Sequence, residues 1–128
     1  MQYGYSKVTD LAYDDAVVKV TEELKKEGFG VLTEIDVKAT MKKKIDKDIK
    51  PYVILGACNP PFAYEALQAE EQVGLLMPCN VIVYENNEGK IVISSLEVAP
   101  LMDMIDNPAF GDFGPKVQEK LHRAIDAV

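Results

Sequence analysis

The chain has 128 residues, of which 48% are hydrophobic and 27% are charged, and its formal net charge is −7. This length is typical of one domain and is sufficient to bury roughly two thirds of the surface that the unfolded chain exposes, so we predict a single domain over residues 1–128. The negative charge argues against a nucleic-acid partner, because affinity for phosphate backbones comes largely from lysine and arginine. No segment is long and apolar enough to span a membrane, and the N-terminus lacks the basic start and apolar centre of a signal peptide. We therefore expect a cytoplasmic protein without a membrane partner.

The N-terminal part of the chain predicts a strand followed by a helix. Alternation over residues 2–8 indicates the strand. Over residues 13–27 apolar side chains recur at steps of three and four, with acidic residues in the first turn and lysines in the last, as in an amphipathic helix. Thr9 and Asp10 are available to cap this helix at its start, and Gly28 fits the left-handed position that ends a helix.

The next segment predicts a second strand and a lysine-rich helical turn. Residues 30–37 alternate between apolar and polar side chains, which is typical of a strand with one buried face. Residues 38–50 contain six lysines and two aspartates, and three apolar residues there are spaced four apart. The simplest interpretation of the run Lys42, Lys43 and Lys44 is a solvated helix face, and the alternative is a surface that receives an anionic ligand or an acidic partner.

Residues 52–57 and 81–85 carry apolar side chains on both faces, so we expect both faces of these two strands to be covered. Asn-Asn-Glu-Gly at 86–89 predicts a hairpin turn into another strand over 90–96. A weak helical turn follows at 100–106. These elements alternate with short helical patterns and no linker divides them.

Pro115 suits the first turn of a final helix whose apolar residues form one stripe, with His122 at the edge of that stripe. The order of elements is then strand, helix, four strands with helical insertions, and helix. This order predicts an α+β fold, a two-layer sandwich in which helices pack on one face of a mostly antiparallel sheet of about five strands.

Both cysteines of the chain lie at the ends of apolar strands. If residues 52–57 and 81–85 pair in antiparallel fashion, Cys58 and Cys79 face each other, with their Cβ atoms about 5 Å apart. Two thiols at that separation need little movement to form a disulfide. The alternative is that both are small packing residues, since free cysteine is among the most buried residue types.

The residues around these cysteines form the candidate ligand-binding site, which consists of Cys58, Asn59, Pro60, Cys79 and Asn80. Asn59 is a favourable helix N-cap and Pro60 a favourable first helical residue, so Cys58 lies just before a helix N-terminus, where the pKa of a thiol can be lowered. Two successive prolines remove backbone N–H groups, which argues against a phosphate site there.

No residue can be assigned a catalytic role from the sequence. A zinc site within one chain requires four ligands, and the chain offers two cysteines and one histidine, His122. The chain contains no G-x-S-x-G motif, Walker loop, dinucleotide fingerprint or H-E-x-x-H motif. We therefore expect neither a metal nor a cofactor.

Four segments of the chain resemble the bacterial and archaeal family called domain of unknown function 302. They are residues 28–37 (GFGVLTEIDV), residues 52–60 (YVILGACNP), Ala63 with Leu67, and residues 74–81 (GLLMPCNV). They occur in order, and the resemblance extends over essentially the whole chain. It implies a two-layer fold of strand, helix, four strands and helix, similar to the TATA-binding protein and often dimeric, and it implies no established activity.

Two functional hypotheses follow. The first is a small ligand-binding or interaction domain that acts as a homodimer, with Leu75, Leu76 and Met77 in the contact or in a pocket wall. The second is a thiol-based redox or metal-handling protein that uses Cys58 and Cys79, and it requires at least one reactive thiolate.

Overall fold

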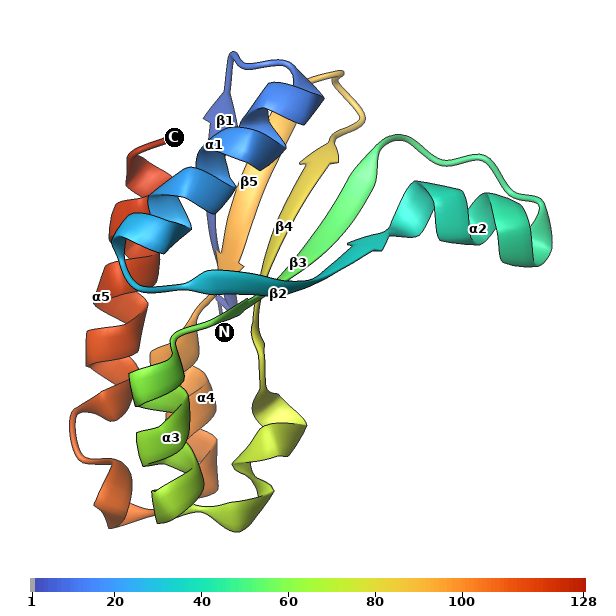
Figure 1. Cartoon of the computed structure of the whole chain (residues 1–128). Helices are drawn as coiled ribbons and strands as arrows, with labels where there is room; N and C mark the ends of the chain where they lie inside the picture. Colours follow the sequence, from blue (N-terminus) through green and yellow to red (C-terminus); the bar gives the residue numbers. More distant parts are fainter. Residues whose placement is uncertain (1) are drawn as a thin grey trace.

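The computed structural model describes residues 2–128; Met1, with which the predicted domain begins, lies outside the described residues. One antiparallel sheet has the strand order β1-β5-β4-β3-β2, and helices pack on one of its faces (Figure 1). The predicted α+β two-layer architecture is confirmed. The strands are β1 (Gly4–Thr9), β2 (Gly30–Asp36), β3 (Tyr52–Cys58), β4 (Cys79–Glu85) and β5 (Ile91–Leu96).

The helical layer consists of α1 (Tyr13–Lys26) and α5 (Phe113–Asp126). Their apolar stripes meet the inner face of the sheet in one core, whose most deeply buried aliphatic side chains are Val20, Leu24, Leu55, Val81, Val83, Ile93, Leu121 and Ile125. Burying one such side chain contributes about 1.5–3 kcal/mol, so the contact between these two helices and the sheet stabilises the fold.

The predicted start and end of α1 are confirmed, whereas the predicted capping of its start by Thr9 or Asp10 is wrong. Ala12 is the residue before the helix, and no side chain caps it, because the Thr9 hydroxyl instead accepts a hydrogen bond from the Leu11 amide at 3.2 Å. Asp10 lies in the same turn. Gly28, with φ of +87°, ends the helix in the left-handed conformation that glycine adopts without strain.

The other face of the sheet is not covered by α1 or α5, which corrects the expectation that both faces of the central strands are covered. Tyr52, Ile54, Ile82 and Tyr84 lie on this face and are half-buried. They cover one another instead, and the rings of Tyr52 and Tyr84 stack with centroids 5.3 Å apart. We call this surface the open face.

The predicted buried face of β2 is also wrong. A β-bulge between Val31 and Thr33 reverses the alternation of the strand, so that Ile35 pairs with Ile54 on the open face. Leu32 and Ile35 are 69% and 48% exposed. Strand β2 is therefore an exposed edge of the sheet.

Helix α2 (Val37–Ile45) follows β2 directly and projects away from the rest of the molecule (Figure 1). The Asp36 carboxylate caps it by accepting a hydrogen bond from the Ala39 amide at 2.9 Å, and Asp46 ends it with φ of 54°. No residue of α2 is buried, and its lysines are exposed, as the solvated-face interpretation expects. We call residues 37–50 the arm.

A cluster of short helices lies beyond the end of the sheet that is opposite to the arm (Figure 1). It consists of α3 (Pro60–Ala69), the 3-10 helix η1 (Glu71–Leu76), α4 (Val98–Ile105) and the 3-10 helix η2 (Pro108–Phe110). We call residues 60–76 and 98–110 the cap. Among the helices described over residues 2–128, none has the length and apolar character needed to cross a membrane.

Candidate functional site

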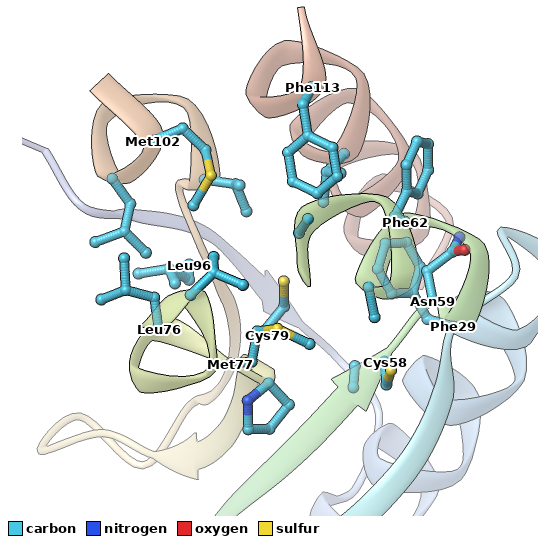
Figure 2. Close-up of a pocket in the computed structure, with 18 residues that line it drawn as sticks. Phe29, Cys58, Asn59, Phe62, Leu76, Met77, Cys79, Leu96, Met102 and Phe113 are labelled. Carbon is cyan, nitrogen blue, oxygen red and sulfur yellow. The ribbon is translucent and has the colours of Figure 1, made fainter. Parts of the chain in front are cut away.

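An apolar cavity of about 50 Å³ lies between the cap, the start of α5 and the adjoining ends of β3, β4 and β5 (Figure 2). Its side chains are hydrophobic with the exception of one amide, that of Asn59. The lining residues are Phe29, Ala57, Cys58, Asn59, Phe62, Ala63, Ala66, Val73, Leu76, Met77, Pro78, Cys79, Leu96, Val98, Leu101, Met102, Phe113 and Val117. Four of them, two cysteines and two methionines, bring sulfur atoms to the wall.

The two cysteines do not face each other directly, which corrects the sequence-based prediction. Strands β3 and β4 pair in antiparallel fashion as expected, but the register places Cys79 opposite Ala57, one residue before Cys58. Because successive side chains of a strand point to opposite faces, this offset separates the two thiols. Figure 2 shows Cys79 on the side of Met77 and Cys58 on the side of Asn59, and both thiols are free.

The environment of Cys79 disfavours its thiolate. Burial raises the pKa of the Cys79 thiol from its ordinary value of 9.0 to about 11, and the nearby Cys58 adds to the shift. The thiolate is the nucleophilic form of cysteine, so Cys79 is protonated and weakly reactive at neutral pH.

Asn59 has a different role from the predicted helix cap. It precedes α3 with an extended backbone, but its side chain makes no capping hydrogen bond. Instead its Nδ2 donates to the carbonyl oxygen of Glu27 at 3.2 Å, and a Cβ added at Gly28 would lie 2.9 Å from the same nitrogen. The buried Asn59 side chain therefore fastens the turn between α1 and β2 to the start of the cap.

The two remaining predicted site residues do not line the cavity. Pro60 occupies the first turn of α3, as expected, and is exposed. Asn80 is exposed on β4, opposite Gly56. A Cβ at Gly56 would lie 2.1 Å from Thr33 Oγ1 and 2.8 Å from Pro78 Cγ, so only glycine permits these side chains to approach the backbone.

Sequence reasoning missed most of the cavity wall and the residue that joins its helices. Phe62 and Phe113 meet edge to face with centroids 5.6 Å apart, and Met102 comes from α4. Asn107 Nδ2 donates to the carbonyl oxygen of Ala69 at 2.9 Å, which ties η2 to the end of α3. Asn107 precedes a proline, as Asn59 does. This repeated Asn-Pro pair is the feature of the sequence from which a structural role of Asn107 could have been predicted.

A cluster of polar side chains joins β1 to α5 outside the cavity. His122 Nε2 contacts Glu97 Oε1, and the Tyr5 ring stacks on the imidazole with centroids 3.7 Å apart. The Tyr5 hydroxyl donates to Asp126 Oδ1 at 2.7 Å, and this hydrogen bond raises the pKa of Tyr5. His122 is half-buried at the edge of the helix stripe, as predicted, and the cluster holds the last helix against the edge strand.

Candidate metal ligands are not gathered anywhere in the described part of the chain. Over residues 2–128 no group of three or more histidine, cysteine, aspartate or glutamate side chains is placed to hold a metal ion. Within this described range, Cys58 and Cys79 have no third such residue beside them.

Comparison with known proteins identifies relatives of the whole chain. The model of the family described as domain of unknown function DUF302 matches residues 5–128. A crystal structure of an uncharacterized conserved protein DUF302 from Bacillus stearothermophilus is similar with a TM-score of 0.92 and 28% sequence identity, over 99% of this chain and 98% of that chain. No curated protein matches this chain. The chain belongs to the DUF302 family.

Proposed function

We propose that this chain is a cytoplasmic ligand-binding domain that holds a small, uncharged, apolar molecule in the cavity and acts as a homodimer. The single observation that carries the proposal is a cavity whose only amide side chain, Asn59, is already hydrogen-bonded to the backbone. Apolar cavities of this kind stay dry and bind apolar molecules, because water finds too few polar partners there.

The size of the cavity limits the ligand. A cavity needs about 10–15 Å³ to hold one water molecule, so a volume of about 50 Å³ admits a ligand of only a few heavy atoms, or one end of a longer apolar molecule. The thioethers of Met77 and Met102 are polarisable and flexible, which suits a wall that adapts to its occupant.

Two further observations support the remaining parts of the proposal. Free thiols at Cys58 and Cys79 are typical of the reducing cytoplasm. The open face exposes parts of Tyr52, Ile54 and Ile82 on one side of the sheet, and contiguous apolar surface of this kind marks contact sites.

We favour ligand binding over the thiol-based alternative because the raised pKa of Cys79 opposes nucleophilic chemistry at neutral pH. The alternative has a direct test. If the alkylation rate of Cys79 rises with an apparent pKa near 7, Cys79 is a reactive thiolate and redox function becomes the better assignment. A rate that rises only above pH 10 supports a packing role for this thiol.

Binding is tested with xenon, which is apolar and small enough for the cavity. We expect NMR spectra of the protein under xenon pressure to show saturable shifts at residues such as Phe62, Ala66 and Met102. In Ala63→Leu, whose larger side chain occupies the cavity, the shifts should disappear. Ala127→Leu changes an exposed alanine outside the cavity and should bind as the wild type does. Shifts that remain in Ala63→Leu, or that are absent in the wild type, would overturn the ligand-binding proposal.

A further inference from the structure

Charge is distributed unevenly between the arm and the rest of the chain. The arm contains six lysines and two aspartates, which give it a formal net charge of +4. The remaining residues contain eight basic and nineteen acidic side chains. A basic projection therefore extends from a strongly acidic body.

The arm lacks the buried side chains that normally stabilise a short helix. Helix α2 has nine residues, none of them buried, whereas isolated helices shorter than about 12–15 residues are marginal in water. Ile45 is 59% exposed and Met41 lies one turn before it on the same side of the helix. A helix with these properties is expected to gain its stability from a surface outside its own domain.

The cap is acidic, and its charge is therefore complementary to that of the basic arm. Residues 60–76 and 98–110 contain no lysine or arginine and five acidic residues, among which Glu65, Glu71 and Asp103 are exposed. No ion pair within residues 2–128 engages these three carboxylates. Leu75 and Met104, which are 82% and 70% exposed, place apolar side chains on the same cap.

The arm and the cap of one molecule cannot meet. The arm joins β3 at Tyr52 and the cap joins it at Cys58, so they lie at opposite ends of a seven-residue strand that spans about 23 Å. This separation exceeds the Debye length of about 8 Å at physiological ionic strength. Figure 1 shows α2 projecting from the end of the sheet that is opposite to α3 and α4.

We propose that the arm of one copy docks against the cap of a second copy, and that the two copies exchange this contact around a two-fold axis. The proposal rests on the homodimer of the proposed function and specifies its interface. Two sheets that face each other across their open faces, with strands running in opposite directions, place each arm beside the partner's cap. Both contacts then form at once, and the assembly closes as a dimer.

The test uses charge reversal on each surface. The arm-reversed variant carries Lys43→Glu, Lys44→Glu and Lys47→Glu, which leaves the ion pairs of Lys42 with Asp46 and Asp48 in place. The cap-reversed variant carries Glu65→Lys, Glu71→Lys and Asp103→Lys. Sedimentation equilibrium should show a dimer for the wild type that weakens with added salt, and each variant alone should have a dimer dissociation constant raised by about tenfold or more at low salt.

Mixing the two variants is the decisive measurement. In their heterodimer each reversed surface meets an opposite charge, so native mass spectrometry of an equimolar mixture should show the heterodimer as the dominant species. A matched control with Lys25→Glu, Lys90→Glu and Lys120→Glu makes the chain equally more negative elsewhere. Its dissociation constant should change less than threefold.

The outcomes separate this proposal from the homodimer itself. A wild-type dimer that both reversals leave intact, or variants that do not recover on mixing, would overturn the arm-to-cap contact while the homodimer stands. A control that dimerises as weakly as the arm-reversed variant would also overturn it, because net charge alone would then explain the effect. A wild type that remains monomeric would overturn both the homodimer and the arm-to-cap contact. Binding of the arm of that monomer to anionic vesicles would then indicate a membrane surface as its partner.

Discussion

Helices α1 and α2 have similar apolar spacing and opposite surroundings. In α1, which has fourteen residues, the apolar residues Ala16, Val20 and Leu24 are buried against the sheet. In α2, which has nine residues, none of the equivalent positions is buried. The comparison shows that the periodicity of a sequence predicts a helix with an apolar side, whereas it does not show which surface covers that side.

The difference arises from the strand that leads into each helix. The turn after β1 returns the chain over the sheet, so α1 lies on the inner face. In β2, the bulge between Val31 and Thr33 has already moved the following apolar side chains to the open face. Helix α2 then continues outward from the end of this strand (Figure 1). The stability of α1 is thus part of the stability of the core, and we expect that of α2 to depend on a partner.

The largest expected change in the free energy of unfolding comes from the buried side of α1. Leu24→Ala removes a fully buried side chain from α1 and should lower the free energy of unfolding by about 2–5 kcal/mol. Urea titration measures this change. Val18→Ala on the exposed side of the same helix should change the free energy by less than about 0.5 kcal/mol. A cost below 1 kcal/mol for Leu24→Ala would show that α1 is as weakly packed as α2.

The second effect concerns the thiol at the margin of the core. Because the folded pKa of Cys79 lies near 11 and its ordinary pKa near 9.0, the unfolded chain loses this proton first, and stability falls as pH rises between these values. At pH 11 about half of the folded chains have also lost this proton, so the loss should reach about 2 kcal/mol there.

Tyr13 and Tyr52 have raised pKa values as well, chiefly through burial, and they titrate in the same alkaline range. The prediction therefore concerns the difference between the wild type and Cys79→Ala in urea titrations at pH 8, 9, 10 and 11. Identical slopes for the two proteins would show that Cys79 is open to solvent, as the arm is.

The third expected change in stability concerns the hydrogen bond by which Asn59 joins the end of α1 to the start of the cap. Asn59→Ala removes the hydrogen bond to the Glu27 carbonyl and should lower the free energy of unfolding by about 1–2 kcal/mol. Asn80→Ala, at an exposed position on β4, is the matched control and should be close to neutral. If both variants cost the same, the joint does not depend on the Asn59 side chain.

The smallest expected effect is on the arm. Ile45→Ala should change the free energy of unfolding of the dilute monomer by less than about 0.5 kcal/mol, because Ile45 is exposed within its own chain. Urea titration at submicromolar protein concentration provides the measurement. A loss of more than 1 kcal/mol under these conditions would mean that the arm packs on its own domain, and the contrast between α1 and α2 would fail.

The sequence alone predicted only a small part of the cavity wall, and it did not predict the geometry of the site. Cys58, Asn59 and Cys79 belong both to the predicted site and to the cavity wall. Met102 and Phe113 were missed, since they come from helices that are distant in sequence, and only the folded chain brings them beside the strand ends. Pro60 and Asn80 were predicted from proximity in sequence, which does not determine the direction of a side chain.

The sequence by itself determined the type and order of the main elements, because helix and strand periodicities, the Asn-Asn-Glu-Gly turn and the glycine after α1 act over a few residues. Only the tertiary structure decided the register that places Ala57 opposite Cys79, the bulge in β2 and the partner of Asn59. These features depend on contacts between segments far apart in the chain. A shift of one residue in such a pairing moves a side chain to the other face of the sheet, so no local pattern reveals where it points.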